Sequence, residues 1–320
     1  MDRLTVTALR WTRPLAAVIA VLAASAIVFA PAYSIAASKA GDSKNPPPAQ
    51  DAGAPGPGKD AGTGKEEKKK AAEPAKGELV KLDWLKGPVK DKSELPSFKM
   101  IYVKGKCFDM GDWTGDGDDD ERPVHKVCLS NYYIGETEVT QKLFAAVLGF
   151  IPNEAKFLGP DNPVGSVTAP MARGFIKRLN ELTKGYYRLP TEAEWEFAAR
   201  GGGKTERWAG VDNEDTLADY AWFSENSDGT LHPVKQKKPN GYGIYDMTGN
   251  VWELTEDYFD FDYYQRSSQR DPLNMEYTTW NSMRGGSIAD EPFWMRATYR
   301  YGIEMHKASA SANVGFRLAE

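Results

Sequence analysis

Hydrophobic and polar positions form regular patterns only beyond about Phe98, and there the periodicity is mixed. The short runs Ile101–Val103 and His125–Leu129 have the extended pattern of strands. Three segments with apolar residues three and four positions apart predict helices, at residues 140–148, 169–183 and 191–199. From Gly201 to the end, glycine, asparagine, aspartate and proline recur so often that the pattern predicts long ordered loops with short strands.

The third predicted helix carries a start signal, LPTEAEWEFAAR at residues 189–200. Thr191 is placed to cap the helix N-terminus, and Glu194, three residues later, completes a capping box. Trp195 and Ala199 are then one turn apart and share a buried face. These positions favour a purely structural helix, whose charges do not imply catalysis.

The N-terminal region has the pattern of an export signal. Arginines occur within residues 1–13, and the run from Leu15 to Ala30 contains no charge. Residues 1–37 are therefore predicted to be a signal sequence or an N-terminal membrane anchor. Cleavage near Ala36 is one alternative; we favour a retained anchor, because residues 14–37 are long enough to span a bilayer. Both alternatives place the rest in the periplasm or another extracytoplasmic space, and the anchor would hold it to the inner membrane.

A low-complexity linker follows this region. Residues 38–78 contain no aromatic residue and almost no large aliphatic one. Such a segment cannot bury enough apolar surface to offset its conformational entropy, so residues 38–97 are predicted to be a disordered linker with a lead-in at 79–97. A charged fraction of 27% and a net charge of −5 are ordinary values for a soluble domain. They give no indication of a nucleic-acid partner.

Seven segments beyond the linker carry a family resemblance. They are CFDMGD (107–112), ERPVHKVCL (121–129), YYIGETEVTQKLF (132–144), YRLPTEAEWEFAARGG (187–202), KPNGYGIYDMTGNVWELTEDYF (238–259), RGGS (284–287) and NVGFRLA (313–319). In this order they resemble the formylglycine-generating enzyme, or sulfatase-modifying factor, family. The resemblance implies an α+β domain at residues 98–320, related to C-type lectins, with two small twisted sheets, a few helices and much ordered loop.

The resemblance also implies a structural calcium site. The family segment that matches DMTGNVWE binds calcium through side chains at the positions of Asp246 and Glu253 and carbonyls at those of Gly249 and Val251. Calcium prefers such oxygen ligands from a tight loop, and the alternative is a turn held by hydrogen bonds without metal. The acidic run at 116–121 lacks the twelve-residue calcium-loop pattern, so a solvated loop is expected there.

The segment RGGSIADEPFWMRATYR, residues 284–300, decides the expected chemistry. In copper-dependent family members, the third and eighth residues after its serine are cysteines that bind copper. Here those positions are Asp290 and Met295. A carboxylate and a thioether do not form the two-thiolate site that Cu(I) prefers. We therefore expect neither bound copper nor copper-dependent formylglycine generation.

The cysteines and histidines indicate no other metal site. Cys107 and Cys128 flank the first predicted hairpin of an exported domain, so a disulfide between neighbouring strands is expected. A redox pair or a copper site is the alternative. His125, His232 and His306 lack metal-binding spacing and are expected to be structural or surface residues.

Two functions remain open. The favoured one is a membrane-tethered envelope module that binds or regulates an unknown envelope protein or small ligand. Its candidate groove is the aromatic segment Tyr258–Tyr264 with Trp280 and Trp294, although many of these rings will be core. The other is a periplasmic tailoring enzyme that uses a different metal or cofactor in the family cleft. Its candidate catalytic residues are Asp290, Glu291, Arg296 and Arg300. Arginine–carboxylate pairing in a structural network explains these residues equally well.

Overall fold

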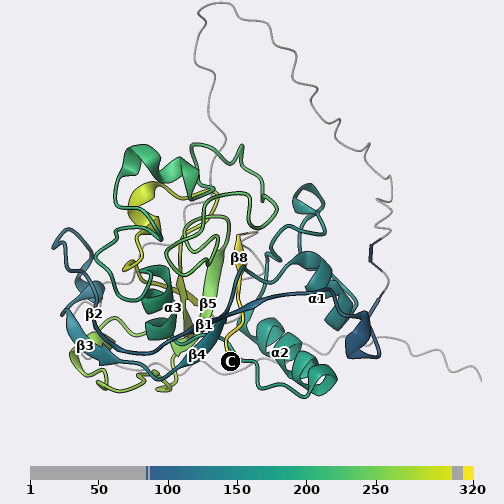
Figure 1. Cartoon of the computed structure of the whole chain (residues 1–320), viewed down its shortest axis with the longest axis horizontal. Coiled ribbons are helices and arrows are strands. Elements are labelled where there is room, and N and C mark those ends of the chain that lie inside the picture. Colours follow the sequence, from purple (N-terminus) through teal and green to yellow (C-terminus); the bar gives the residue numbers. More distant parts are fainter. Residues whose placement is uncertain (1–83, 86, 305–312) are drawn as a thin grey trace, which may run out of the picture. The chain divides into compact units, whose positions relative to one another are not determined.

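The computed structural model describes residues 84–85, 87–304 and 313–320, so the predicted signal or anchor and most of the linker lie outside the described residues. The strands are β1 (Met100–Val103), β2 (Cys107–Met110), β3 (His125–Cys128), β4 (Tyr132–Gly135), β5 (Trp252–Tyr258), β6 (Trp280–Arg284), β7 (Tyr301–Glu304) and β8 (Val314–Gly315). The helices are α1 (Gln141–Leu148), α2 (Ala169–Thr183) and α3 (Glu192–Ala199). Long loops separate these short elements, which confirms the predicted α+β class (Figure 1).

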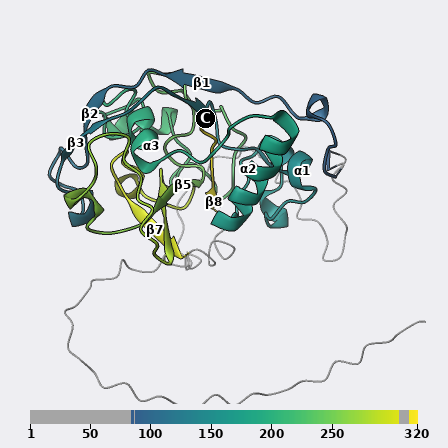
Figure 2. The ribbon, with the colours of Figure 1, turned by 90° about the horizontal axis from the view of Figure 1, so that it is seen from below.

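The described strands form three small sheets rather than the two expected. β1 pairs with β4 and β2 with β3, both antiparallel. The largest sheet has the order β7-β6-β5-β8, with β5 and β8 parallel. Figure 2 shows β1 and β7 on opposite sides of the domain. The predicted strand at 101–103 lies within β1, and the one at 125–129 is β3, which ends one residue earlier.

Helices α1 and α2 lie beside each other in Figures 1 and 2 because each has an apolar stripe. Thr140 and Thr168 cap their N-termini through the side-chain oxygen. Phe144 of α1 stacks on Phe175 of α2 with ring centres 5.4 Å apart, and both meet Phe316 edge-on. The same cluster includes buried residues of β5, β6 and β8, so it joins these helices to the largest sheet. No helix in the described part of the chain is both long and apolar enough to cross a bilayer.

Helix α3 is buried along its whole length. Thr191 caps it by accepting a hydrogen bond from the backbone of Glu194, whose side chain accepts from the Thr191 backbone in return. Trp195 and Phe197 lie in a second core cluster, where Phe108 of β2 packs against Phe197 with ring centres 5.0 Å apart. The predicted capping box and buried face are confirmed.

Part of the predicted lead-in lies against the domain. The backbone N–H of Val89 donates to the carbonyl of Ala146 in α1 at 2.7 Å. Leu95 packs on the cluster around α1 and α2. These contacts tie residues 87–97 to the domain ahead of β1.

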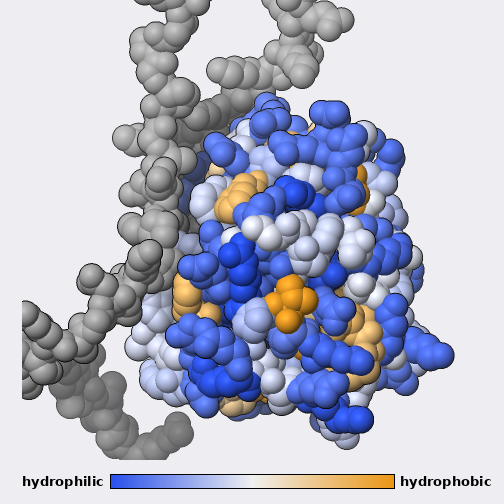
Figure 3. Space-filling view, turned by 90° about the vertical axis from the view of Figure 1, so that its left-hand side faces the viewer, coloured by the Kyte–Doolittle hydropathy of each residue, from blue (hydrophilic) through white to orange (hydrophobic). Residues whose placement is uncertain are grey.

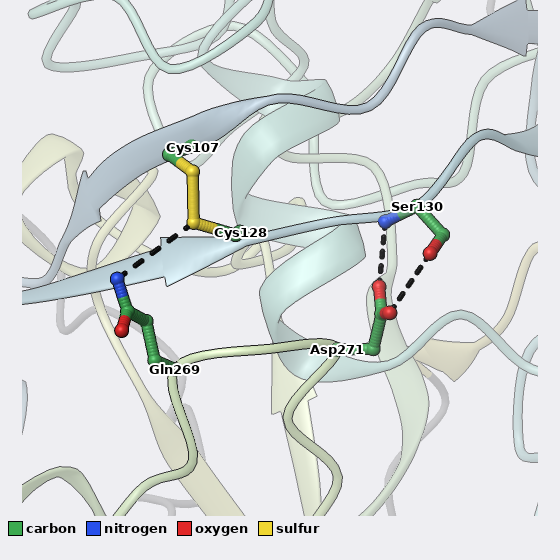
Figure 4. The surroundings of a disulfide bond; sticks show 5 residues. All are labelled: Cys107, Cys128, Ser130, Gln269 and Asp271. Carbon is green, nitrogen blue, oxygen red and sulfur yellow. Dashed lines mark hydrogen bonds between the residues drawn. A yellow bond between two sulfur atoms is a disulfide. The ribbon is translucent and has the colours of Figure 1, made fainter.

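The predicted disulfide between Cys107 and Cys128 is present and joins directly opposed residues of β2 and β3. Figure 4 shows a loop running along the other edge of β3, where the side-chain amide of Gln269 donates to Cys128 Sγ at 3.9 Å. In the same loop, Asp271 accepts from the backbone and hydroxyl of Ser130 at 2.6 and 2.8 Å. The disulfide closes the segment that contains the acidic run.

Candidate functional site

A glycine pair turns the chain out of β6 into the segment at 287–300. Gly285 and Gly286 have φ angles of 98° and 70°, which residues with side chains rarely adopt. A Cβ on Gly286 would clash with the side chain of Met295. The pair therefore allows the backbone to pack directly on Met295, one of the two positions that carry cysteine in copper-dependent family members.

Asp290 and Met295, which occupy the positions of the copper-binding cysteines, both contact other residues of the domain. Met295 is fully buried in a cluster with Trp208 and Phe223. Asp290 accepts a hydrogen bond from the Ser287 hydroxyl at 2.5 Å. Burial raises the pKa of the Asp290 carboxyl above its ordinary value, and the hydrogen bonds from Ser287 oppose this rise. Neither residue supplies a thiolate, and the two cysteines of the chain are bonded to each other.

The candidate arginines pair with carboxylates of other segments. Arg296 makes a two-pronged pair with Glu121, with N–O distances of 2.9 and 2.7 Å. Arg300 pairs in the same way with Glu192 of α3, at 2.8 and 3.0 Å. Glu291 is exposed. The described contacts therefore do not unite the four candidates in one catalytic cluster, and they support a structural role for the two arginines.

The expectation of a solvated acidic loop is wrong for its last two residues. The Asp119 side chain is 84% exposed, but Asp120 and Glu121 are 5% and 0% exposed. Arg300 donates to the carbonyl of Asp120, and Glu121 pairs with Arg296. No local pattern marks this burial, because the partner arginines lie 175 and 180 residues away.

Further buried arginines, which the sequence patterns did not single out, extend this network. Glu196 of α3 accepts from Arg200 at 2.8 Å and from Arg284 at 2.5 Å. Glu253 of β5 pairs with Arg317 through two contacts of 2.6 Å. The sequence contained one signal of these pairs, the alternating glutamates of TEAEWE. Glutamates that are buried require partners, which the arginines provide. The predicted structural role of the α3 charges agrees with these contacts.

The predicted calcium residues lie in a tight turn that leads into β5. Asp246 and Gly249 have φ angles of 56° and 79°, and Val251 is fully buried. Burial raises the pKa of Asp246 to about 6, and the nearby charge of Glu253 adds to this rise. Arg317 donates both to the backbone carbonyl of Asp246, at 3.3 Å, and to the carboxylate of Glu253, at 2.6 Å, so the two predicted ligands lie close together.

Both of these carboxylates already have protein partners. Asp246 accepts from the backbone N–H of Lys235 at 2.8 Å. Glu253 accepts from the indole of Trp195 at 2.8 Å and from Arg317 through both oxygens. Because the Arg317 guanidinium already neutralises Glu253, the donor set fits calcium only in part.

A third carboxyl group beside this turn was not marked by any pattern. Glu138 is 2% exposed, and neither of its oxygens is hydrogen-bonded to another residue in the described ranges. Burial raises the pKa of Glu138 well above its ordinary value; the charge of Asp246 adds to the rise, and Arg317 opposes it. With Glu253, three acidic side chains surround the Arg317 guanidinium, and only Asp246 is also attracted by the charge of Lys235, so protons or a cation would remove the remaining charge.

Across residues 84–85, 87–304 and 313–320, no three histidine, cysteine, aspartate or glutamate side chains form a group able to hold a metal ion. His125 lies against Tyr264 with ring centres 4.6 Å apart, and His232 stacks on Trp222 at 3.6 Å. These contacts agree with structural roles. His306 lies outside the described residues.

The predicted aromatic groove is divided between core and surface. Phe259 and Tyr264 are buried, whereas Phe261 is 42% exposed. Trp294 is 36% exposed and meets Phe293 edge-on, with ring centres 5.0 Å apart. Figure 3 shows a largely hydrophilic face with isolated hydrophobic residues. Part of the predicted groove is therefore core, and its exposed rings lie in contact with other rings, as Trp294 does with Phe293.

In the described residues, small sheets, a few helices and long loops cross-linked by buried arginines define an α+β domain with the formylglycine-generating-enzyme-like fold. A model of the sulfatase-modifying factor enzyme 1-like domain matches residues 86–320, and the chain belongs to this family.

Individual relatives show the range of this family. The formylglycine-generating enzyme of Streptomyces coelicolor is 30% identical over 284 residues, covering 68% of this chain and 88% of that enzyme. Inactive C-alpha-formylglycine-generating enzyme 2 of Bos taurus is 26% identical over 306 residues, covering 75% of this chain and 94% of that protein. The solved structure of Treponema denticola variable protein 1 has a TM-score of 0.63 and 30% identity, covering 69% of this chain and 94% of that one.

Proposed function

We propose that this chain is an exported, membrane-tethered protein whose domain binds or regulates another component of the cell envelope, without copper-dependent formylglycine formation. The proposal rests on the side chains at the positions of the two copper-binding cysteines. There Asp290 is hydrogen-bonded to Ser287, and Met295 is packed in the core. A carboxyl and a thioether do not supply the thiolates that Cu(I) prefers. The relatives include a formylglycine-generating enzyme and a protein named inactive, so membership alone does not imply the activity.

The tether is proposed from the N-terminal sequence. Residues 14–37 are long enough to span a bilayer, and residues 38–78 have the composition expected of a spacer. A cross-strand disulfide supports an oxidising, extracytoplasmic location. Alkaline washing of membranes tests the tether: a retained anchor stays with the bilayer, a cleaved chain is released, and recovery from the cytosol would overturn export.

Measurement of copper binding tests the proposal that the domain lacks a Cu(I) site. The wild-type chain is expected to bind no Cu(I) in competition with a chromogenic chelator. The double variant Asp290→Cys/Met295→Cys is expected to gain about one Cu(I) per chain, because it restores two soft ligands. Met295→Cys alone is the matched control and should gain no tight site, because it leaves one thiolate beside a hard carboxylate. Stoichiometric copper in the wild-type chain would contradict the proposal.

A tailoring enzyme with a different metal or cofactor is the second candidate, and one observation favours it. Asp290 is a half-buried carboxyl with a raised pKa, beside the Ser287 hydroxyl, in the segment that carries the family chemistry. Elemental analysis of the purified chain tests it. Stoichiometric iron that is lost in Asp290→Asn would support this function over the binding module.

We also propose one structural calcium ion at the 246–253 turn. The excess of buried carboxyl groups around Arg317 supports it, since calcium would remove the charge that Arg317 leaves. Asp246 and Glu253 would hold the ion with the carbonyls of Gly249 and Val251. Protonation of Glu138 and Asp246 is the competing way to remove the same charge.

The variant Glu138→Gln distinguishes neutralisation by protons from neutralisation by calcium. Without calcium, Glu138→Gln is expected to raise the free energy of unfolding by about 1–2 kcal/mol at a pH of about 7.5 and to change it little at about pH 4. A buried acid whose pKa is higher in the folded state than in the unfolded state contributes its full stabilisation below its unfolded pKa. This contribution is lost as the pH rises through its folded pKa. Wild-type stability should therefore fall between about pH 4 and pH 6, the pKa of Asp246. Urea unfolding at both pH values measures the effect.

The matched control for this experiment is Glu154→Gln, whose side chain is 62% exposed, and it should change stability by less than about 0.5 kcal/mol. If calcium removes the charge instead, added CaCl2 raises the wild-type melting temperature, a chelator lowers it, and Glu138→Gln reduces the response. A wild-type melting temperature that responds to neither would overturn the calcium proposal.

A further inference from the structure

A polar hollow lies apart from the Asp290 segment. Its volume is about 520 Å³, and its lining includes Asp219, Tyr245 and the three lysines of the turn KQKK, which are Lys235, Lys237 and Lys238. None of its lining residues belongs to the segment at 284–300. Cavities of a few hundred Å³ are of the size that holds small ligands.

Among the lysines of the hollow, Lys237 differs in that it forms no direct ion pair with a described residue; Asp219 attracts it from a longer distance. Its ammonium donates to the carbonyl of Ala218 at 2.5 Å and lies 3.7 Å from the centre of the Trp222 ring. The other face of that ring stacks on His232. No carboxylate lies within ion-pair distance of Lys237 in the described part of the chain. Burial lowers the pKa of Lys237, and the charge of Asp219 opposes this shift. An anion in the hollow would stabilise the partly desolvated ammonium further.

The neighbouring lysines each have one carboxylate and remain accessible. Lys235 pairs with Glu136 at 2.7 Å and Lys238 with Asp219 at 2.8 Å, and the lysine side chains are 42% and 60% exposed. Glu136 is shared with Lys99, at 2.9 Å, and the carboxylate of Asp246 below the turn is buried, so the accessible surface of the hollow carries more ammonium groups than carboxylates. Ammonium groups that keep free donors bind oxyanions as point charges.

Contacts with Asp246 and Tyr245 hold the lysine turn in place. Lys235 has a φ of 66°, an uncommon left-handed conformation for a residue with a side chain. Its N–H donates to the buried carboxylate of Asp246 at 2.8 Å, and its ammonium lies 5.0 Å from the centre of the Tyr245 ring. Strained backbone of this kind persists where the surroundings hold it, and it clusters at binding sites.

We propose that this hollow binds a phosphate or sulfate group, either as the free ion or as the monoester of a small polar molecule such as a sugar. Lys237 would contact the oxyanion, and Lys235 and Lys238 would orient it. The volume exceeds what one ion fills, and the Tyr245 ring offers a wall for an attached sugar. The site goes beyond the proposed envelope role and does not depend on the copper positions.

Titration of the full chain with glucose 6-phosphate, inorganic phosphate and inorganic sulfate, at constant ionic strength, tests the proposal by calorimetry. Saturable binding with a Kd of about 1 mM or tighter is expected, and Lys237→Gln should weaken it at least about tenfold. Lys237→Arg, which keeps the charge, should retain most of the affinity. Lys177→Gln removes an exposed lysine of α2 and should change nothing.

The two sources of the anion give different results. Equal affinity for inorganic phosphate and glucose 6-phosphate indicates a free-ion site, and tighter binding of the ester indicates that the sugar contributes. Absence of saturable binding up to about 10 mM overturns the proposal. So does binding that survives Lys237→Gln in a variant whose circular dichroism and melting temperature match the wild type.

Discussion

Replacing Arg296 with methionine is expected to lower the free energy of unfolding by about 3–5 kcal/mol, because it leaves a buried carboxylate without its partner. Arg296 and Glu121 have side-chain exposures of 2% and 0% and are joined by two hydrogen bonds. The partner charge cannot reach water once the guanidinium is gone. Chemical denaturation followed by tryptophan fluorescence measures the loss.

A second variant distinguishes a structural pair from a catalytic arginine. The double change Arg296→Met/Glu121→Leu removes both charges and is expected to regain most of the stability. Arg178→Met is the matched surface control: Arg178 and Glu181 are 39% and 51% exposed, so its loss should stay below about 1 kcal/mol. Wild-type stability in Arg296→Met would refute the structural role and return Arg296 to the list of catalytic candidates.

Removing the disulfide is expected to cost about 3 kcal/mol, the value for closing a loop of about twenty residues in the unfolded chain. The Cys107→Ser/Cys128→Ser variant should unfold at lower denaturant, and wild-type protein in excess reductant should match it. The closed segment carries Glu121, so its release also loosens one side of the Arg296 pair.

The variant without cysteines supplies its own control, because reductant should leave its stability unchanged. Asp271→Asn tests the neighbouring loop separately, since Asp271 accepts two hydrogen bonds from Ser130 while the disulfide stays intact. A wild-type unfolding midpoint that reductant does not move would show that the cross-link adds nothing to stability.

The aromatic segment shows that residue type alone does not predict which side chains are buried. The segment at 258–264 contains tyrosines and phenylalanines in close succession, yet Tyr264 is buried and Phe261 is exposed. Burial of a loop residue depends on which distant segment covers it. The lysine turn at 235–238 was equally unmarked, because its charge becomes informative only where Asp219, Trp222 and Tyr245 surround it.

The sequence by itself determined the family, the α+β class, the helix starts, the Cys107–Cys128 pair and the absence of cysteine at Asp290 and Met295. These follow from local spacing and from residue identity at matched positions, which need no knowledge of distant contacts. Only the tertiary structure decided that Arg296 and Arg300 are tied to Glu121 and Glu192, that Asp120 and Glu121 are buried, and that the Glu138 carboxyl accepts no hydrogen bond from another described residue. A buried charge is acceptable only when a group far along the chain reaches it, and such pairing depends on the folded arrangement of loops that carry no periodic pattern.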